Sequence, residues 1–290
     1  MNNIFNFKRF GRTLRHDIIG TANRAGLSML LGPVIVLLTV ALIMQIYDIV
    51  FMYGSPGENI PVYPVARFVI LCITHIIMML FMATSSFGYL TDNRNNVTQL
   101  MLPASTLEKF LSITIIYYVF TPIVIFLAGW AGDTLIALTG LGGFTGYMNP
   151  ADLIGGLGNL YDMVLPYEMT PILNKVLWSF LAGYFMIASF TLLCALLFKT
   201  YKVLKTIGIY LGLNLIIGNV QTLFWGNKLM AVLNGMDAGT LDQSGQSTDI
   251  MMQGMFDFLD KSMSYGMIFS IVAFIALSVA IYYRLRTVKS

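Results

Sequence analysis

Four polar residues in or beside long apolar runs are the first candidates for chemistry: Asp48, His75, Asn214 and Asn219. A carboxylate inside a membrane can couple transport to an ion, whereas one at a water-exposed helix end needs no such role. We interpret Asp48 as lying near the outer end of its helix, with ion coupling as the alternative. His75 is expected to form a hydrogen bond between helices rather than to act in catalysis. Asn214 and Asn219 are interpreted in the same way, with a pore-facing role as the alternative.

Motifs for catalysis or cofactor binding do not occur in the sequence. It has no GxxxxGK[ST] phosphate-binding loop, no HExxH zinc motif and no GxSxG nucleophile motif. His16 and His75 fall in different parts of the predicted topology and make a poor metal site. Cys72 and Cys194 both fall in apolar runs and are expected to behave as small apolar residues. We therefore predict a chain that is not an enzyme and that binds no cofactor or metal itself.

The composition predicts an all-α polytopic membrane protein. Of 290 residues, 57% are hydrophobic and 11% are charged, whereas soluble domains carry roughly 25% charged residues. Runs of about 20 apolar residues are long enough to cross a bilayer as helices, and a backbone in lipid must satisfy its own hydrogen bonds. We predict one transmembrane domain, 1–290, with six spans at 27–52, 68–90, 111–132, 176–198, 206–225 and 264–283.

The distribution of Lys and Arg predicts that both ends of the chain are cytoplasmic. With the N-terminus inside, thirteen of the 17 basic residues fall on the inner side, as the positive-inside rule requires. The net charge of +3 therefore reflects membrane topology, and we expect no nucleic-acid partner. Residues 4–20 carry an apolar stripe beside basic residues and are predicted to form an interfacial helix in contact with membrane lipids. Two long outer loops are predicted, at 133–175 and 226–263.

The inner loop between the second and third spans has the most readable pattern. Pro103 disfavours a helix at the residue before it. Ser105 fits an N-cap, and Glu108 follows three residues later, which is the spacing of a capping box. Residues 92–101 are long enough for a short helix under the membrane. We therefore predict a helix, a break and then a capped helix, and the plain alternative is a simple connection between two spans.

The phrase from Leu102 to Leu111, LPASTLEKFL, resembles a loop of ABC-2-type transporter permeases and related bacterial membrane proteins. The wider topology is similar too: an interfacial N-terminal helix, six spans, both ends inside and an elaborated outer loop between the fifth and sixth spans. The long loop 133–175 departs from the family pattern. The resemblance implies a multi-pass protein of the bacterial cytoplasmic membrane.

In that family the loop after the second span carries a coupling helix that docks on an ATPase. By position, this helix corresponds to residues 92–102, and the resemblance also places outer re-entrant helices at 226–263. The implied partners are a cytoplasmic ABC ATPase, which binds the ATP, and a second permease subunit in a homodimer or heterodimer. The residues of the implied coupling loop are Asp92, Arg94, Gln99, Pro103, Ser105, Glu108 and Lys109.

The resemblance implies an exporter subunit that moves a lipid-like, amphipathic or drug-like substrate with energy from the separate ATPase. The 19 methionines suit a flexible apolar lining, although membrane helices are apolar in any case. Two alternatives from other classes stay open. One is a non-transporting membrane scaffold or regulatory subunit, and the other is a stand-alone channel or secondary transporter. The latter needs buried ion-binding charge, which the predicted spans do not contain apart from Asp48.

Overall fold

The computed structural model of the chain describes residues 5–51, 64–91, 104–144, 146–149, 170–237 and 246–287. Side chains in these ranges are described except at 48–51, 64–65, 170–174, 177 and 220–259. The long elements in the described ranges are all helices, so the predicted all-α class is confirmed.

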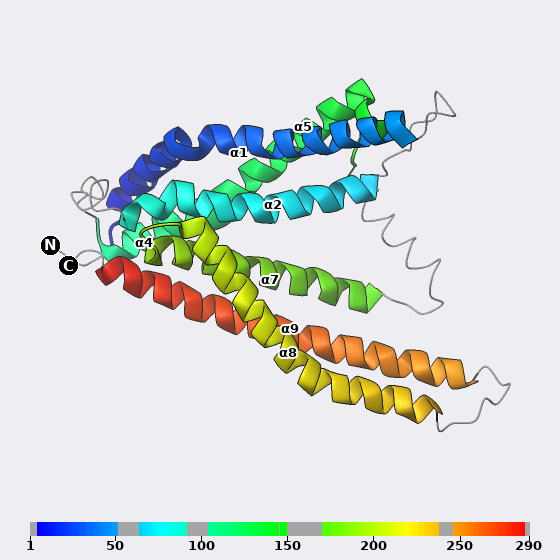
Figure 1. The fold of residues 1–290 in the computed structure, drawn as a ribbon. Helices are drawn as coiled ribbons and strands as arrows, with labels where there is room; N and C mark the ends of the chain where they lie inside the picture. The colour runs from blue at the N-terminus through cyan, green and yellow to red at the C-terminus, as the bar shows by residue number, and fades with distance from the viewer. Residues whose placement is uncertain are drawn as a thin grey trace.

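Six long helical elements form an elongated bundle (Figure 1). They are α1 (Phe7–Phe51), α2 (Pro64–Phe87), a rod made of α4 (Thr106–Ile115), η2 (Ile116–Phe120) and α5 (Thr121–Thr139), then α7 (Thr170–Leu197), α8 (Lys202–Asp237) and α9 (Gln246–Thr287). Short 3-10 turns follow two of them: η1 (Gly88–Thr91) after α2 and η3 (Leu141–Gly143) after α5. The start of α1 and the end of α9 lie at the same end of the bundle, which we call the terminal end, and the opposite end is the far end.

Five of these elements are long and apolar enough to cross a membrane. The candidate spans in the described residues are Phe7–Tyr47, Ala66–Thr91, Thr106–Thr139, Trp178–Leu197 and Asp260–Thr287. Between 11% and 39% of each apolar stretch is buried inside the protein, so most of this apolar surface faces outward. A large outward-facing apolar surface is what lipid solvates and water does not. The chain is a multi-span helical membrane protein.

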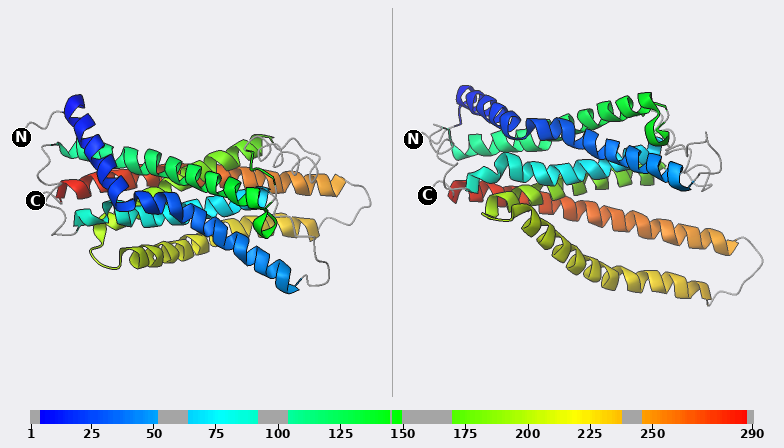
Figure 2. Two further views of the ribbon diagram at one scale, coloured as in Figure 1. Left: turned by 90° about the horizontal axis from the view of Figure 1, so that it is seen from above. Right: turned by 45° about the horizontal axis from the view of Figure 1, so that its top comes forward.

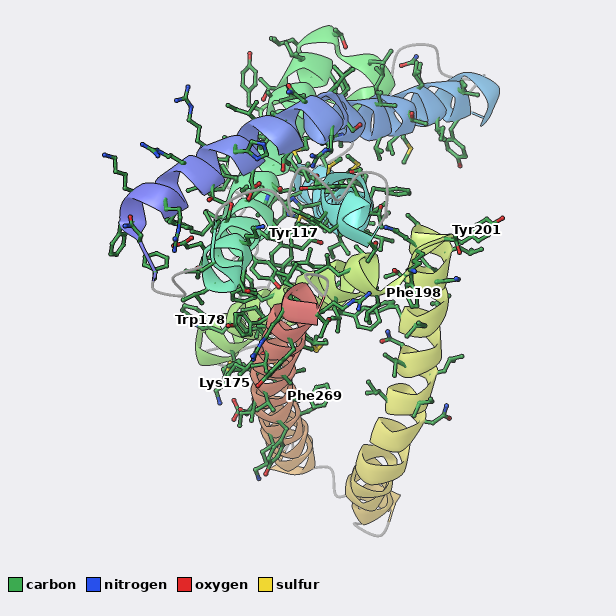
Figure 3. All side chains as sticks on the ribbon, turned by 90° about the vertical axis from the view of Figure 1, so that its left-hand side faces the viewer. Tyr117, Lys175, Trp178, Phe198, Tyr201 and Phe269 are labelled. Carbon is green, nitrogen blue, oxygen red and sulfur yellow. The ribbon has the colours of Figure 1, made fainter. Side chains whose placement is uncertain are left out.

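Helix α8 contains the predicted span 206–225 but is not among the five candidates. It stands apart from the other helices over much of its length (Figures 1 and 3). Its described side chains are largely exposed, among them Leu211, Leu215 and Ile216. Six helices are therefore present as predicted, and five of them have the length and composition of membrane spans.

Helix α1 differs from the prediction because it runs without interruption through the segment assigned to an interfacial helix and the first span. At 1.5 Å per residue, 45 residues extend about 68 Å, which is roughly twice the thickness of the hydrocarbon core. The part of α1 that precedes the apolar run must therefore extend beyond the bilayer core or bend into its surface. Figure 2 shows that α1 changes direction along its length. The residues between 20 and 27 are helical and join the two predicted elements into one helix.

The segment 226–263, where the resemblance places outer re-entrant helices, is helical in its described residues. Helix α8 continues to Asp237 and α9 begins at Gln246, so the segment consists mainly of the extended far ends of these two helices. The two helices run toward the far end together (Figure 2). Gly, Asn and Gln residues in this stretch do not interrupt the helices, although a single Gly inside a helix costs about 1 kcal/mol relative to Ala.

The rod of α4, η2 and α5 contains one turn of π-helix, which has a clear local cause. Pro122 has no N–H and cannot bond to the carbonyl of Tyr118, four residues earlier. The N–H of Thr121 instead donates to the carbonyl of Ile116, five residues back. The wider turn adds a residue without ending the rod. As a result, the adjacent side chains of Tyr117 and Tyr118 are both buried.

Two apolar cores hold the bundle together. The larger one, toward the terminal end, joins α1, α2, α4, η2, α7 and α9 and includes the fully buried residues Tyr117 and Leu192. The smaller one, toward the far end, joins α1, α2, α5 and η3 around Leu37, Leu71 and Phe144. Tyr117 lies among these helices when the bundle is viewed from the terminal end (Figure 3). The side chains of α8 that are described, up to Asn219, belong to neither core.

Candidate functional site

The predicted capping box at the start of α4 is confirmed. Ser105 has extended backbone angles, φ −68° and ψ 160°, as an N-cap residue should. The N–H of Glu108 donates to Ser105 Oγ at 3.3 Å, and the N–H of Ser105 donates to Glu108 Oε2 at 2.8 Å. Both residues of the box are therefore committed to starting this helix.

Glu108 does more than cap α4, because its carboxylate also holds the start of α1. Arg9 Nε donates to Glu108 Oε2 and Arg9 Nη2 donates to Oε1, both at 2.7 Å. The N–H of Asn6 donates to Oε1 at 2.9 Å. The Glu108 side chain is fully buried, so four N–H donors replace the water that it lost. The charge of Glu108 thus joins two helices that are separated by about a hundred residues in sequence.

A second polar contact joins α1 to α4 further along both helices. Ser112 Oγ donates to Asp17 Oδ2 at 2.6 Å, and both residues are buried. Lys109, which the resemblance places in the coupling loop, is also buried, with 7% of its surface exposed. The Glu108 and Lys109 side chains are thus both buried at the start of α4, and Glu108 lies in the joint with α1.

The end of α2 is anchored by a different set of contacts. Lys202, at the start of α8, donates from Nζ to the carbonyl of Gly88 and to Thr91 Oγ1, the latter at 2.7 Å. Thr91 Oγ1 also lies 3.3 Å from the carbonyl of Phe198, at the end of α7. Tyr201, in the short turn between α7 and α8, has φ 50°, and this sharp turn directs Lys202 back onto η1.

These two anchored points flank the segment 92–103. Its predicted residues Asp92, Arg94, Gln99 and Pro103 lie outside the described residues. The element before the segment, η1, is tied to the turn between α7 and α8, and the element after it, α4, is tied to α1. The elements on either side of this segment are therefore each held by hydrogen bonds to another helix.

The intramembrane polar residues that the sequence singled out are not brought together into one site. His75 Nε2 lies 3.3 Å from the hydroxyl of Tyr184, which links α2 to α7. The amides of Asn214 and Asn219 donate to carbonyls four residues earlier in the same helix, those of Tyr210 and Leu215. Asp48 belongs to α1, but its side chain is not described.

Two tyrosines of the π-helical turn make buried polar contacts that the sequence analysis missed. Tyr117 OH donates to the carbonyl of Met79 at 3.0 Å and lies 2.7 Å from Thr191 Oγ1. Tyr118 OH donates to Ser189 Oγ at 2.8 Å. The signal that could have revealed them is Pro122, because a proline inside an apolar span widens the preceding turn.

The structure also contains a buried ion pair in the far half of the bundle. Arg67, in the first turns of α2, and Asp133, in α5, have fully buried side chains whose Nε and Oδ1 atoms are 3.5 Å apart. Arg67 Nη2 donates to the carbonyl of Gly146 at 3.0 Å. Both residues belong to candidate spans of the structure, which extend past the predicted spans 68–90 and 111–132. Each lies just outside the apolar run that marked its span, and for this reason both were assigned to loops.

No catalytic or cofactor-binding arrangement emerges from these contacts. The described residues contain no group of three or more His, Cys, Asp or Glu side chains that could hold a metal ion. The candidate site is a set of buried polar contacts in the described elements on either side of residues 92–103. No protein-family model matches this chain, and neither do any curated proteins or solved structures.

Proposed function

We propose that this protein is the membrane-spanning permease subunit of an ABC-2-type exporter. In this proposal a separate cytoplasmic ATPase binds the ATP and docks on residues 92–102, and a second permease subunit completes the transporter. The chain itself performs no catalysis and holds no cofactor. The terminal end of the bundle faces the cytoplasm.

The observation that carries the proposal is the four-donor environment of Glu108. In a permease, the segment that receives force from the ATPase must be joined rigidly to the spans that move. Glu108 follows the proposed docking segment directly and ties α4 to α1 through Arg9 and Asn6. Lys202 gives the preceding element η1 a comparable attachment. A loop that merely connects two spans has no need of such joints at both ends.

An apolar groove supports the assignment of a lipid-like or amphipathic substrate. It lies between α2, α5 and α7, with a volume of about 410 Å³, and its lining includes Phe68, Phe126 and Phe180. Pockets of a few hundred Å³ with apolar walls are typical of sites for small organic ligands. The groove borders the outward-facing apolar surface, so a hydrophobic molecule could enter it from the membrane.

The experiment that tests the proposal is co-purification from the native membrane in mild detergent, with ATP hydrolysis measured on the isolated complex. We expect an ABC ATPase to accompany the wild-type chain and to be released by Arg94→Glu or Asp92→Lys. Arg12→Glu is the matched control, because Arg12 is exposed near the start of α1 and lies outside the proposed docking segment. If no ATPase is recovered, or if Arg12→Glu releases it equally well, the proposal fails and a non-transporting scaffold becomes the better interpretation.

A secondary transporter is the second candidate, and the Arg67–Asp133 pair is the observation that favours it. Buried charges in candidate spans mark ion pathways in many transporters. For this candidate, uptake or export in proteoliposomes should follow a proton or sodium gradient without ATP, and Asp133→Asn should abolish that dependence. The same proteoliposome transport assay, repeated with an ATPase present, distinguishes the ABC exporter from the secondary transporter.

A further inference from the structure

We propose that the groove between α1 and α2 binds one anionic phospholipid of the leaflet at the terminal end. The groove has a volume of about 610 Å³ and is open to the outside. The inference does not depend on transport or on an ATPase, because it concerns binding alone. Three features carry it: a gradient of polarity along the groove, a guanidinium beside its polar end and a distance from that guanidinium to the apolar wall that matches one leaflet.

The polarity of the groove changes from its terminal end toward its middle. Ser28 and Ser85 are exposed near the terminal end and place hydroxyl groups on the two facing helices. Beyond them the walls are apolar and exposed, with Leu31, Ile35 and Phe81 among the lining residues. A site with this gradient suits a molecule that has a polar head and a hydrocarbon chain.

Arg24 supplies the positive charge at the polar end. It lies one turn before Ser28 on α1, and its side chain is exposed. Its guanidinium carbon is 3.6 Å from the centre of the Tyr89 ring, and Nη1 donates to the carbonyl of Ser86 at 3.4 Å. These contacts hold the guanidinium against the end of α2 and use one of its five N–H groups. The others can bond to a phosphate, which arginine recognises through paired N–H donors.

The distance from Arg24, one turn before the groove, to Ile35 in its apolar wall is close to the depth of one leaflet. Arg24 and Ile35 are eleven residues apart on α1, which is about 17 Å along the helix axis. Half of the hydrocarbon core of a bilayer is roughly 15 Å. A lipid with its phosphate at Arg24 therefore has its acyl chain beside Leu31 and Ile35. The charge complementarity selects an anionic lipid, because the attraction of a basic side chain to anionic headgroups adds to the burial of the chain.

The test uses native mass spectrometry of the full-length protein in detergent with added phosphatidylglycerol or phosphatidylcholine. We expect one phosphatidylglycerol to be retained in preference to phosphatidylcholine. Arg24→Gln should weaken its retention about fivefold or more. Ser28→Phe, which fills the polar end of the groove, should weaken retention of both lipids.

Two matched controls distinguish the groove from general attraction to a basic surface. Arg12→Gln removes an exposed charge on the same helix, and Leu30→Phe adds an aromatic ring to α1 at a residue that does not line the groove. Both should leave retention within about twofold of wild type, since neither touches the groove. Equal retention of the two lipids, or equal losses in Arg12→Gln and Arg24→Gln, would overturn the proposal. If circular dichroism shows that Arg24→Gln does not fold, the proposal is tested by comparing Ser28→Phe with Leu30→Phe. Weaker lipid retention in Ser28→Phe alone supports the groove as the site, and equal retention in the two variants overturns it.

Discussion

Arg9 and Glu108 form a two-pronged ion pair, with both N–O distances at 2.7 Å, that joins the first turn of α1 to the first turn of α4. The Glu108 side chain is fully buried, whereas Arg9 is 29% exposed. The carboxylate is thus the fixed partner, held by its own helix and by two backbone N–H groups. This geometry makes Glu108 the residue on which the joint depends.

Replacing Glu108 by alanine should destabilise the protein. The change removes four hydrogen bonds and leaves the N–H groups of Asn6 and Ser105 without their acceptor. We expect the free energy of unfolding to fall by about 2–4 kcal/mol, measured by thermal unfolding in detergent. Glu108→Gln keeps one acceptor oxygen and should lose less. An unchanged melting temperature in Glu108→Ala would show that the joint does not hold the two helices.

The buried hydroxyls of Tyr117 and Thr191 should be energetically coupled. Tyr117→Phe removes a hydroxyl that contacts both Met79 and Thr191, with Tyr117 fully buried. We expect each single variant, Tyr117→Phe and Thr191→Val, to lower stability by about 1–2 kcal/mol. In a double-mutant cycle the coupling should be about 0.5–1.5 kcal/mol. Strict additivity would mean that the 2.7 Å contact contributes nothing.

The Arg67–Asp133 pair should respond differently to single and double substitutions. Removing one partner leaves an uncompensated charge in a fully buried site, so Asp133→Leu or Arg67→Met alone should cost about 3–5 kcal/mol. The double variant leaves no charge behind and should regain most of that loss. Chemical unfolding in mixed micelles can compare the three proteins. A double variant as unstable as the worse single variant would show that the pair is needed for more than neutralising its own charges.

Two glycines at the end of α5 provide a matched test of close packing. Gly140 and Gly142 both have positive φ, 66° and 61°, so alanine is strained at either position, by about 1–2 kcal/mol. A Cβ on Gly142 would overlap the carbonyl oxygen of Ala41 in α1, whereas one on Gly140 would meet no atom within 4 Å. Gly142→Ala should therefore lower the melting temperature clearly more than Gly140→Ala. Equal effects would show that α1 and η3 can separate without cost.

Local features of this chain could be predicted because they depend on nearby residues. Ser105 and Glu108 form the predicted capping box, since its geometry is set within four residues. The apolar runs marked every long helix. In contrast, Arg9 reaches Glu108, and Arg67 reaches Asp133, only because the helices pack side by side. No spacing rule connects residues that far apart in sequence.

The lengths of the helices were harder to predict than their presence. Hydropathy marks the part of a helix that lies in lipid, but α1 and α9 continue well beyond their apolar runs. Outside the membrane a helix can continue through polar residues, because they have adequate helix propensity and water solvates their side chains. The described residues of the segments assigned to an interfacial helix, 4–20, and to an outer loop, 226–263, are therefore parts of longer helices.

The continuity of α1 has a geometric consequence. One of the points at which the helix packs against α5 is Pro33, whose Cβ is 3.3 Å from the position that a Cβ on Gly129 would occupy. Phe7 lies 26 residues to one side of Pro33 and Phe51 lies 18 residues to the other, which gives arms of about 39 Å and 27 Å. A tilt of about 10° around this fulcrum would swing the Arg9 end by roughly 7 Å and the opposite end by roughly 5 Å in the other direction. If α1 moved as one body about Pro33, a displacement of its Arg9 end would therefore appear as a smaller displacement of its opposite end.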